Sequence, residues 1–414
     1  MLIKETVSTP ADGYRTSSSV SQTIRKSELN ICLTALAPFK TKERLDVLTG
    51  YRGIAAYSVL FAHTFGLLTL GKYEFPSHLA CFGMSLFFVL SGFVITYNYE
   101  QLFGRENFAS AIYKFFVARF ARLYPLYVVI ISANILWAPS LSCLHKLYIV
   151  LSYLTLTQSW FNLQKALFTP AWSISTEWFF YLAFIPMTVL LRRITKPAWT
   201  LTVFCIVTTI ALILVFNLFK APLILTVGHL LPATGKIGIS ASAWDWITYF
   251  SPVTRLFDFI AGAMTAKAYQ SLKGTSPSAL LAQCTLVAAL LWCTVWISVS
   301  WNVFPWLSDL LHDFIFAPGI AALLLITCLY KSRLTNLLSS APCLLAGDIS
   351  YSVYIWSIPV MKAVSVWLDR DFALQSAAIP IKALICIAAT TLLAYGSYSL
   401  IEQPSRRWIR GRLS

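Results

Sequence analysis

Apolar stretches of roughly 20 residues recur along the chain, and they restrict the fold more than any other feature of the sequence. A stretch of this length crosses the hydrocarbon of a bilayer as an α-helix, in which every backbone polar group finds a partner within the segment. The 414 residues are 57% hydrophobic and only 12% charged, which lies outside the usual range for soluble domains. The sequence therefore predicts an all-α, polytopic transmembrane helix bundle.

Hydropathy along the chain predicts ten spans. They lie near residues 53–70, 80–98, 123–138, 171–191, 199–219, 252–271, 279–300, 314–330, 345–368 and 377–400. A weaker apolar segment at 147–160 is expected to be re-entrant or interfacial. Residues 1–44, rich in Ser, Thr and Lys, are expected to form a cytoplasmic, partly disordered N-terminal tail. Residues 45–410 then form one transmembrane domain.

The distribution of positive charge predicts the orientation of this bundle. If 147–160 does not cross, most Lys and Arg of the short loops share one side, which should be cytoplasmic and should hold both termini. The opposite side keeps only Lys72, Lys146, Lys165, Lys220, Lys236 and Arg370. The net charge of +15 thus fits membrane loops, and no nucleic-acid partner is expected.

The cysteine pattern gives no indication of a metal site. The nine cysteines are scattered, mostly within apolar segments, without a CxxC pair or a histidine at zinc-ligand spacing. We expect them to pack as small hydrophobic residues, and we expect no metal.

The first predicted span contains Arg52 and, eleven residues later, His63. In a helix these positions are about 16 Å apart along the axis and about 20° apart around it, so they share a face. A polar side chain inside the hydrocarbon normally faces the bundle interior or a wet cavity. His63 is therefore a candidate general base that removes a proton from an attacking hydroxyl. The competing interpretation is a core histidine that hydrogen-bonds to a neighbouring helix.

Two further segments supply charged groups. In WSISTEWFFYL (172–182), Glu177 falls within the first two turns of the fourth span, with Ser173 one turn earlier on the same face. Glu177 is a candidate to orient the imidazole or stabilise its protonated form, or else it is an ion-paired anchor. In RFARLYPLY (119–127), Arg119 and Arg122 share a face just before a span. The pair suits a phosphate-rich ligand, although an ordinary positive flank has the same pattern.

Polar side chains also occur in later spans. Ser350, Tyr351 and Tyr354 are candidates to line the route of the acceptor substrate, or they form hydrogen bonds between helices. Arg255 and Asp258, three residues apart, are expected to neutralise each other.

Taken together, five motifs in order resemble the membrane acyltransferase-3 family over residues 40–410. They are LDVLTGYRGIAAYSVLFAH (45–63), RFARLYP (119–125), WSISTEWFFYL (172–182), GDISYSVYIW (347–356) and IEQPSRRW (401–408). The resemblance implies that Arg52, His63, Arg119 and Arg122 are functional positions. One departure is Ser357, since the family often carries a histidine there. Some members of that family carry an appended extracytoplasmic hydrolase-like domain, whereas this sequence ends a few residues after IEQPSRRW, so we expect a stand-alone protein.

The resemblance further implies a function at the inner, cytoplasmic membrane of a bacterium. Family members transfer acyl groups, commonly acetyl, from acyl-coenzyme A (acyl-CoA) to sugar hydroxyls of lipopolysaccharide, exopolysaccharide, Nod factors, peptidoglycan or macrolides. On this hypothesis His63 and Glu177 are catalytic, Arg52, Arg119 and Arg122 bind acyl-CoA, and Ser173, Tyr351 and Tyr354 contact the glycan or lipid-linked sugar acceptor.

Two other classes of function stay open. A proton-coupled secondary transporter of a sugar or lipid precursor also uses intramembrane His, Glu and Arg, but no repeat symmetry is visible in the sequence. A non-catalytic sensor or scaffold predicts that no single intramembrane polar residue is essential.

Overall fold

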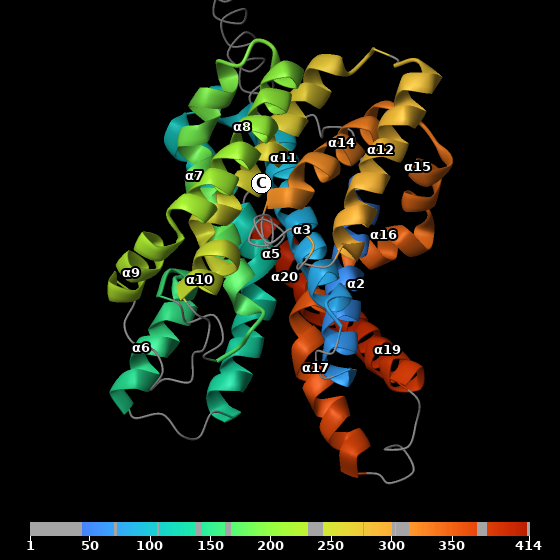
Figure 1. Cartoon of the computed structure of the whole chain (residues 1–414). Helices are drawn as coiled ribbons and strands as arrows, with labels where there is room; N and C mark the ends of the chain where they lie inside the picture. The colour runs from blue at the N-terminus through green and yellow to red at the C-terminus, as the bar shows by residue number, and fades with distance from the viewer. Residues whose placement is uncertain are drawn as a thin grey trace, which may run out of the picture. The chain divides into compact units, whose positions relative to one another are not determined.

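The computed structural model of the protein is built from α-helices (Figure 1). It describes residues 44–69, 73–105, 107–137, 143–161, 167–230, 243–275, 277–299, 303, 314–370 and 379–411, and none of these residues is in a β-strand. The predicted N-terminal tail, residues 1–44, falls outside the described residues except for Arg44. Residues Leu45–Ser414 group together as one unit by their contacts.

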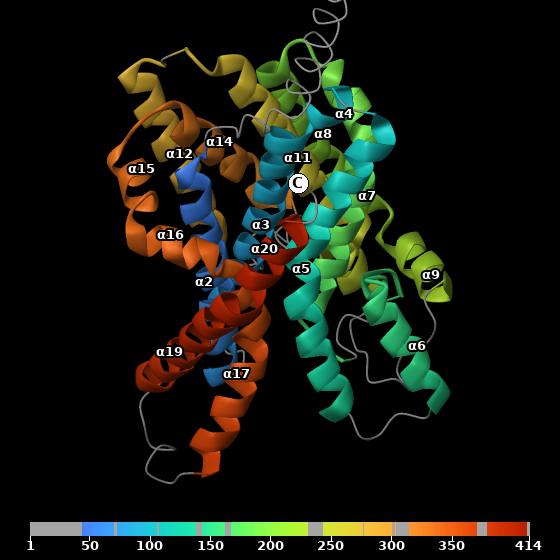
Figure 2. The ribbon, with the colours of Figure 1, turned by 180° about the vertical axis from the view of Figure 1, so that it is seen from behind.

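The longer helices, which Figure 1 and Figure 2 show from opposite sides, overlap the predicted spans. They are α2 (Asp46–Leu68), α3 (Phe75–Tyr99), α5 (Phe108–Trp137), α7 (Ala171–Arg192), α8 (Pro197–Leu218), α11 (Pro252–Leu272), α12 (Ala279–Ser298), α14 (Ala317–Leu329), α17 (Ser350–Arg370) and α19 (Ile379–Ser397).

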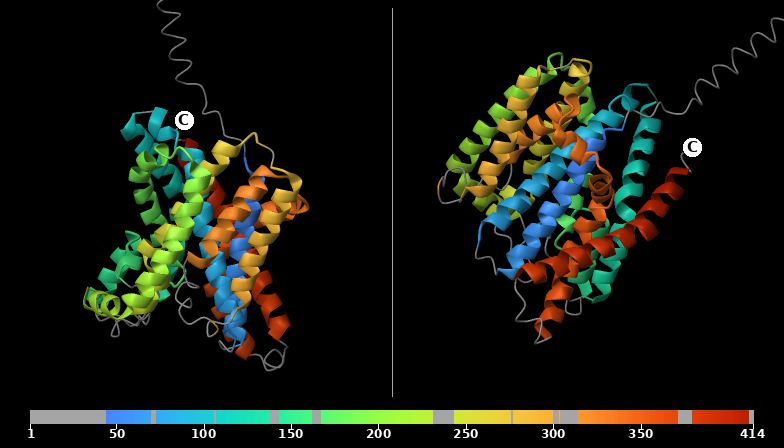
Figure 3. Two further views of the ribbon diagram at one scale, coloured as in Figure 1. Left: turned by 45° about the horizontal axis from the view of Figure 1, so that its top comes forward. Right: turned by 90° about the vertical axis from the view of Figure 1, so that its right-hand side faces the viewer.

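Shorter elements connect or extend them. The short α-helices are α4 (Leu102–Arg105), α6 (Cys143–Leu154), α9 (Lys220–Leu230), α10 (Ala243–Asp245), α15 (Arg333–Leu338), α16 (Ala341–Asp348) and α20 (Gln403–Gly411). The 3₁₀ turns are η1 (Gln158–Phe161) and η4 (Phe314–Phe316), and the π-helical segments are η3 (Trp246–Phe250) and η5 (Tyr398–Glu402). Figure 3 shows α19, η5 and α20 as one nearly continuous rod.

Six helical segments of the described chain are long and apolar enough to cross a membrane, or seven if α16 and α17, bent by 65°, form one span. The other predicted spans coincide with α2 and α11, which are long but more polar, and with the shorter α14. The protein is thus a multi-pass membrane helix bundle, while the number of ten spans remains a prediction. The weak segment at 147–160 forms α6 and η1, and a 12-residue helix is about 18 Å long, less than the hydrocarbon thickness.

The start of one helix differs from the predicted start of its span. Arg119 and Arg122 were expected just before the span at 123–138, but α5 begins at Phe108 and both arginines lie in the middle of this helix. Hydropathy does not reveal the early start of α5, because the charged side chains lower the mean hydropathy of the helix that carries them. The helix tolerates them since they face the bundle interior, where Arg119 is only 5% exposed.

Helix α3 lies at the centre of the bundle and packs most extensively against α11 and α2. Its crossing with α11 depends on two glycines: a Cβ atom on Gly92 would lie 1.9 Å from the Phe259 carbonyl oxygen, and one on Gly262 would lie 1.9 Å from the Val89 carbonyl oxygen. Glycine allows the two backbones to approach this closely. The crossing fixes the α3 face that lines the functional site.

Candidate functional site

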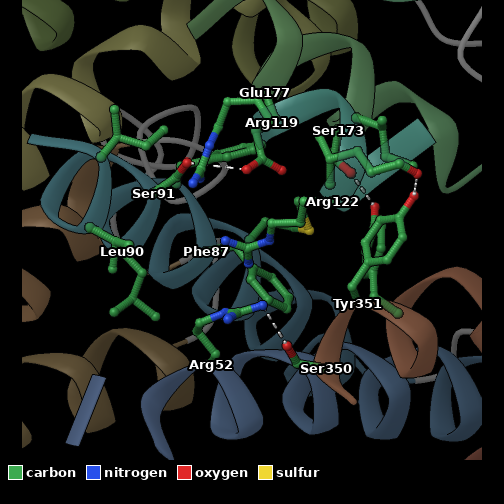
Figure 4. Close-up of a pocket in the computed structure, with 17 residues that line it drawn as sticks. Arg52, Phe87, Leu90, Ser91, Arg119, Arg122, Ser173, Glu177, Ser350 and Tyr351 are labelled. Atoms are coloured by element: carbon green, nitrogen blue, oxygen red, sulfur yellow. Dashed lines mark hydrogen bonds between the residues drawn. The ribbon is translucent and has the colours of Figure 1, made fainter. Parts of the chain in front are cut away.

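A cavity lies among α2, α3, α5, α7 and α17 (Figure 4), and the space within it that no atom fills, including the open solvent at its mouth, is about 690 Å³. Its apolar wall comes mainly from α3. The polar residues that line it come from all five helices and are Arg52, Ser91, Arg119, Arg122, Ser173, Glu177, Ser350, Tyr351 and Tyr354. The structure therefore brings together every predicted site residue except His63.

Two tyrosines hold Arg119. Its Nη2 atom donates a 2.8 Å hydrogen bond to the Tyr99 hydroxyl, and its guanidinium carbon lies 4.8 Å from the centre of the Tyr99 ring. The Tyr181 ring is 5.9 Å from the same carbon. Aromatic faces stabilise a buried guanidinium without neutralising it. Arg119 thus keeps its positive charge inside the bundle.

Arg52 and Arg122 enter the cavity from α2 and α5. Arg52 Nη2 donates a 3.3 Å hydrogen bond to Ser350 Oγ. Arg122 Nε is buried and has no hydrogen-bond partner in the part of the chain that the structure describes. Figure 4 shows the side chains of Arg52 and Arg122 near each other in the cavity, so their like charges repel.

Glu177 is the carboxylate that lines the cavity, and neutral hydroxyls hold it. Its Oε1 atom accepts a 2.6 Å hydrogen bond from Tyr181 Oη and a 3.2 Å hydrogen bond from Ser91 Oγ. Tyr181 lies one helical turn after Glu177 on α7. Two donors on one oxygen fix the orientation of the carboxylate and leave its second oxygen unengaged by them.

The charges in the cavity do not balance. Three guanidiniums face one carboxylate, and among the described residues no ion pair joins Glu177 to any of the three. Desolvated positive charges without a counter-charge are costly. The arrangement therefore suits an anionic ligand with several oxygens, because each guanidinium can donate two parallel hydrogen bonds.

Hydroxyl groups from α7 and α17 form the other polar part of the cavity. Ser173 Oγ donates a 2.8 Å hydrogen bond to Tyr354 Oη, which in turn donates to the Pro170 carbonyl oxygen at 3.1 Å. Tyr351 Oη donates to the Leu123 carbonyl oxygen at 2.7 Å. These residues thus connect helices and line the cavity at once, so the two interpretations drawn from the sequence are compatible.

His63 lies on α2 but does not line this cavity. Its Nδ1 atom is buried and has no hydrogen-bond partner among the described residues. Ala56 and Leu60, both fully buried, lie between Arg52 and His63 on the same face of α2. The hydrogen bonds of Glu177 Oε1 go to Ser91 and Tyr181, and among the described residues none joins Glu177 to His63 Nδ1.

Sequence reasoning missed Ser91, Tyr99 and Tyr181. Tyr181 had a usable signal, because a tyrosine four residues after a membrane-embedded glutamate lies on the same helical face. Tyr99 had none, since it reaches Arg119 from another helix.

Arg255 and Asp258 form the expected pair. Arg255 Nη1 lies 3.2 Å from Asp258 Oδ2, and both side chains are fully buried. Ser85 Oγ donates to Asp258 Oδ2 at 3.3 Å. The pair lies behind the cavity wall, because the Arg255 guanidinium carbon is 5.8 Å from the ring centre of Phe88.

Comparisons with known proteins agree with this architecture. The model of a family described as an acyltransferase domain matches residues 45–399. "Protein 2 in picA locus" of Rhizobium radiobacter is 38% identical over 107 residues, which are 25% of this chain and 50% of that protein. The acyltransferase MdmB of Streptomyces mycarofaciens is 31% identical over 165 residues, 36% of this chain and 41% of that protein.

The matched stretches thus span half or less of these curated relatives. No solved structure matches the chain. The family model, by contrast, covers most of the helix bundle, including every helix that lines the cavity. The chain therefore belongs to the acyltransferase-3 family of membrane proteins.

Proposed function

We propose that the protein is an O-acyltransferase of the bacterial inner membrane that moves an acyl group, acetyl in the simplest case, from acyl-CoA to a sugar hydroxyl of a cell-surface or secreted glycan. The observation that carries this proposal is the cavity in which three guanidiniums face one carboxylate, with no ion pair between Glu177 and any of the three among the described residues. Coenzyme A is a polyanion with a pyrophosphate and a ribose phosphate, so its charge complements that of the cavity. MdmB, which is similar to part of the chain, is an acyltransferase by name.

Three residues would bind the donor. Arg119, held by Tyr99, and Arg122, whose Nε has no partner among the described residues, both present guanidinium groups on α5 to the cavity. Arg52 adds a third guanidinium from α2. In a bundle with ten spans and cytoplasmic termini, this cavity would receive acyl-CoA from the cytoplasm, and the thioester arm would extend along α2 toward His63.

The chemical step would take place at His63. Its imidazole would accept the proton of the sugar hydroxyl while the hydroxyl oxygen attacks the thioester carbonyl carbon. The new C–O bond forms, the C–S bond breaks, and the coenzyme A thiolate takes up the proton from the imidazolium. Glu177, held by Tyr181 and Ser91, would stabilise positive charge on the imidazolium through its own negative charge and at a distance, because His63 lies outside the cavity that Glu177 lines. Ser173, Tyr351 and Tyr354 would contact the substrates beside it.

Labelled acetyl-CoA added to membranes that contain the protein tests the proposal. We expect label in a glycan or lipid-linked sugar, and loss of this label in the variant His63→Ala at equal protein level. Arg407→Lys, an exposed arginine of α20 that does not line the cavity, is the matched surface control. Transfer at the normal rate by His63→Ala would remove the imidazole from the scheme. Sugar transport driven by a proton gradient, without acyl transfer, would favour the transporter hypothesis.

A further inference from the structure

The cavity differs in character along its length. Helix α3 lines it from Met84 to Ile95, and these residues are about 16 Å apart along the helix. Near Ile95, Arg119 is held by Tyr99 and Tyr181, so that end is charged. The opposite end, which we call the Met84 end, is formed by Met84, Phe87, Phe88, Ile174 and Tyr354.

Contacts between helices show that α3 and α7 run in the same direction along the cavity. Ser91 of α3 donates to Glu177 of α7 at 3.2 Å. The Phe87 ring, one turn earlier on α3, lies 5.8 Å from the Tyr354 ring, and Tyr354 accepts the hydrogen bond of Ser173, one turn earlier on α7. Ser173 and Tyr354 therefore lie at the Met84 end, away from Arg119.

The Met84 end is lined by buried side chains. Met84 and Phe88 are each 3% exposed, and Ile174 is 2% exposed. The ring of Phe88 is backed by Phe180 at 5.2 Å and Trp172 at 5.9 Å, so Phe88 cannot move away from the cavity without disturbing a packed aromatic cluster. Phe87 packs against the buried cluster that contains Ala56 and Leu60 of α2.

We propose that the Met84 end is the pocket for the acyl group, and that Met84 limits the length of the chain that is transferred. This inference rests on the proposed function, because it needs the coenzyme A phosphates at the charged end, beside Arg119. A thioester whose phosphates occupy the charged end places its acyl carbons at the opposite end. There Met84, Phe88 and Ile174 offer apolar contacts, and the hydroxyls of Ser173 and Tyr354 offer a polar side to the thioester carbonyl.

Met84 is the limiting residue because its side chain is flexible and removable. Phe88 is fixed by its aromatic neighbours, and Phe87 by Tyr354 and α2. Shortening Met84 to alanine removes the thioether arm and leaves room for the additional carbons of a butyryl group. A pocket of this kind discriminates by about 10- to 200-fold for each methylene that does not fit.

A series of acetyl-, butyryl- and hexanoyl-CoA tests the proposal with the full-length protein in membranes. In Met84→Ala we expect the ratio of kcat/KM for butyryl-CoA to that for acetyl-CoA to rise by about tenfold or more over the unsubstituted protein. Met84→Leu, which conserves volume, and Val94→Ala, which removes apolar volume toward the charged end, should keep the original ratio. An unchanged ratio in Met84→Ala, or an equal rise in Val94→Ala, would overturn the proposal.

A second variant covers the case in which Met84→Ala does not fold. Ile174→Val shortens another wall of the same end by one methyl group, and the ratio should rise in the same direction, by a smaller factor. The outcomes separate the two proposals. If the unsubstituted protein transfers none of the three acyl groups, the proposed function fails. If it transfers them and neither variant at this end shifts the ratio, only the acyl pocket fails.

Discussion

At the scale of single residues, the hydrogen bond that Tyr181 Oη donates to Glu177 Oε1 is short, at 2.6 Å, and it joins two side chains. A hydrogen bond to a charged group in a low-dielectric interior contributes about 1.5–3 kcal/mol. We expect Tyr181→Phe to lower kcat/KM for acyl transfer by about tenfold or more, since the carboxylate loses one of the two donors on Oε1. Steady-state kinetics in membranes measure this.

The matched control for that substitution is Tyr124→Phe. The Tyr124 hydroxyl donates 2.9 Å to the Leu154 carbonyl oxygen at an exposed site, and Tyr124 does not line the cavity. Its loss should leave kcat/KM within about twofold of the original value. Equal effects of the two substitutions would show that Tyr181 contributes only to packing.

Arg122 provides a second prediction about a single residue. Its guanidinium faces the cavity and its Nε has no partner among the described residues, so the phosphates of bound acyl-CoA would be its main partners. Arg122→Lys keeps the charge but removes the two parallel donors. We expect KM for acetyl-CoA to rise by about tenfold while kcat changes by less than about twofold. Initial rates over a range of acetyl-CoA concentrations test this, and an unchanged KM would contradict a role in donor binding.

Most of the residues that converge on the cavity were predictable from the sequence. Arginine, glutamate and tyrosine within apolar segments are costly, so they indicate a shared interior, and the structure places six of these predicted residues around one cavity, together with the predicted Ser173. The hydrogen bonds that hold them were not predictable, because Arg119 on α5 donates to Tyr99 on a different helix, α3. The separation of His63 from the cavity was equally hidden, since it depends on the packing of Leu60 and Phe87.

At the scale of elements, the close crossing with α11 holds α3, the helix that supplies most of the apolar wall of the cavity. Its glycines stand within apolar helices, where sequence alone does not distinguish a close crossing from an ordinary position. The helix ranges were easier to predict than the start of α5, because apolar length determines a span whereas charged residues within a helix obscure its first turns.

This crossing gives a prediction about stability. Gly92→Ala and Gly262→Ala would each place a methyl group 1.9 Å from a carbonyl oxygen of the partner helix. Backbone must move to relieve such an overlap, and overpacking costs about 1–3 kcal/mol. We expect each variant to lower the Tm of the protein in detergent. Size-exclusion chromatography of heated samples measures this Tm.

Gly396→Ala is the control for helix composition. A Cβ atom at Gly396, within α19, would meet no atom within 4 Å, and alanine favours a helix more than glycine does. Its Tm should stay the same or rise slightly. A fall in Tm equal to that of Gly92→Ala would show that the glycines matter for a reason other than the crossing.

At the scale of the whole molecule, the orientation of the bundle determines which substrate reaches the cavity from which compartment. The access of both substrates in the proposed reaction depends on this orientation, because acyl-CoA is in the cytoplasm. The distribution of Lys and Arg predicts ten spans and cytoplasmic termini only if the segment 147–160, which forms α6 and η1, does not cross. If it did cross, the basic connection between α7 and α8 would lie outside.

Cysteine labelling of intact cells distinguishes these two orientations. In a variant without the nine native cysteines, single cysteines are placed at Lys196, between α7 and α8, and at Tyr73, between α2 and α3. We expect a membrane-impermeant maleimide to label position 73 in intact cells and position 196 only after the cells are opened, since basic short loops are retained in the cytoplasm. Labelling of position 196 in intact cells would show that the second half of the bundle has the inverted orientation. The helices α3 and α7, which here line one cavity in the same direction, would then have to be reconciled with opposite orientations, so that result would also contradict the geometry of the site.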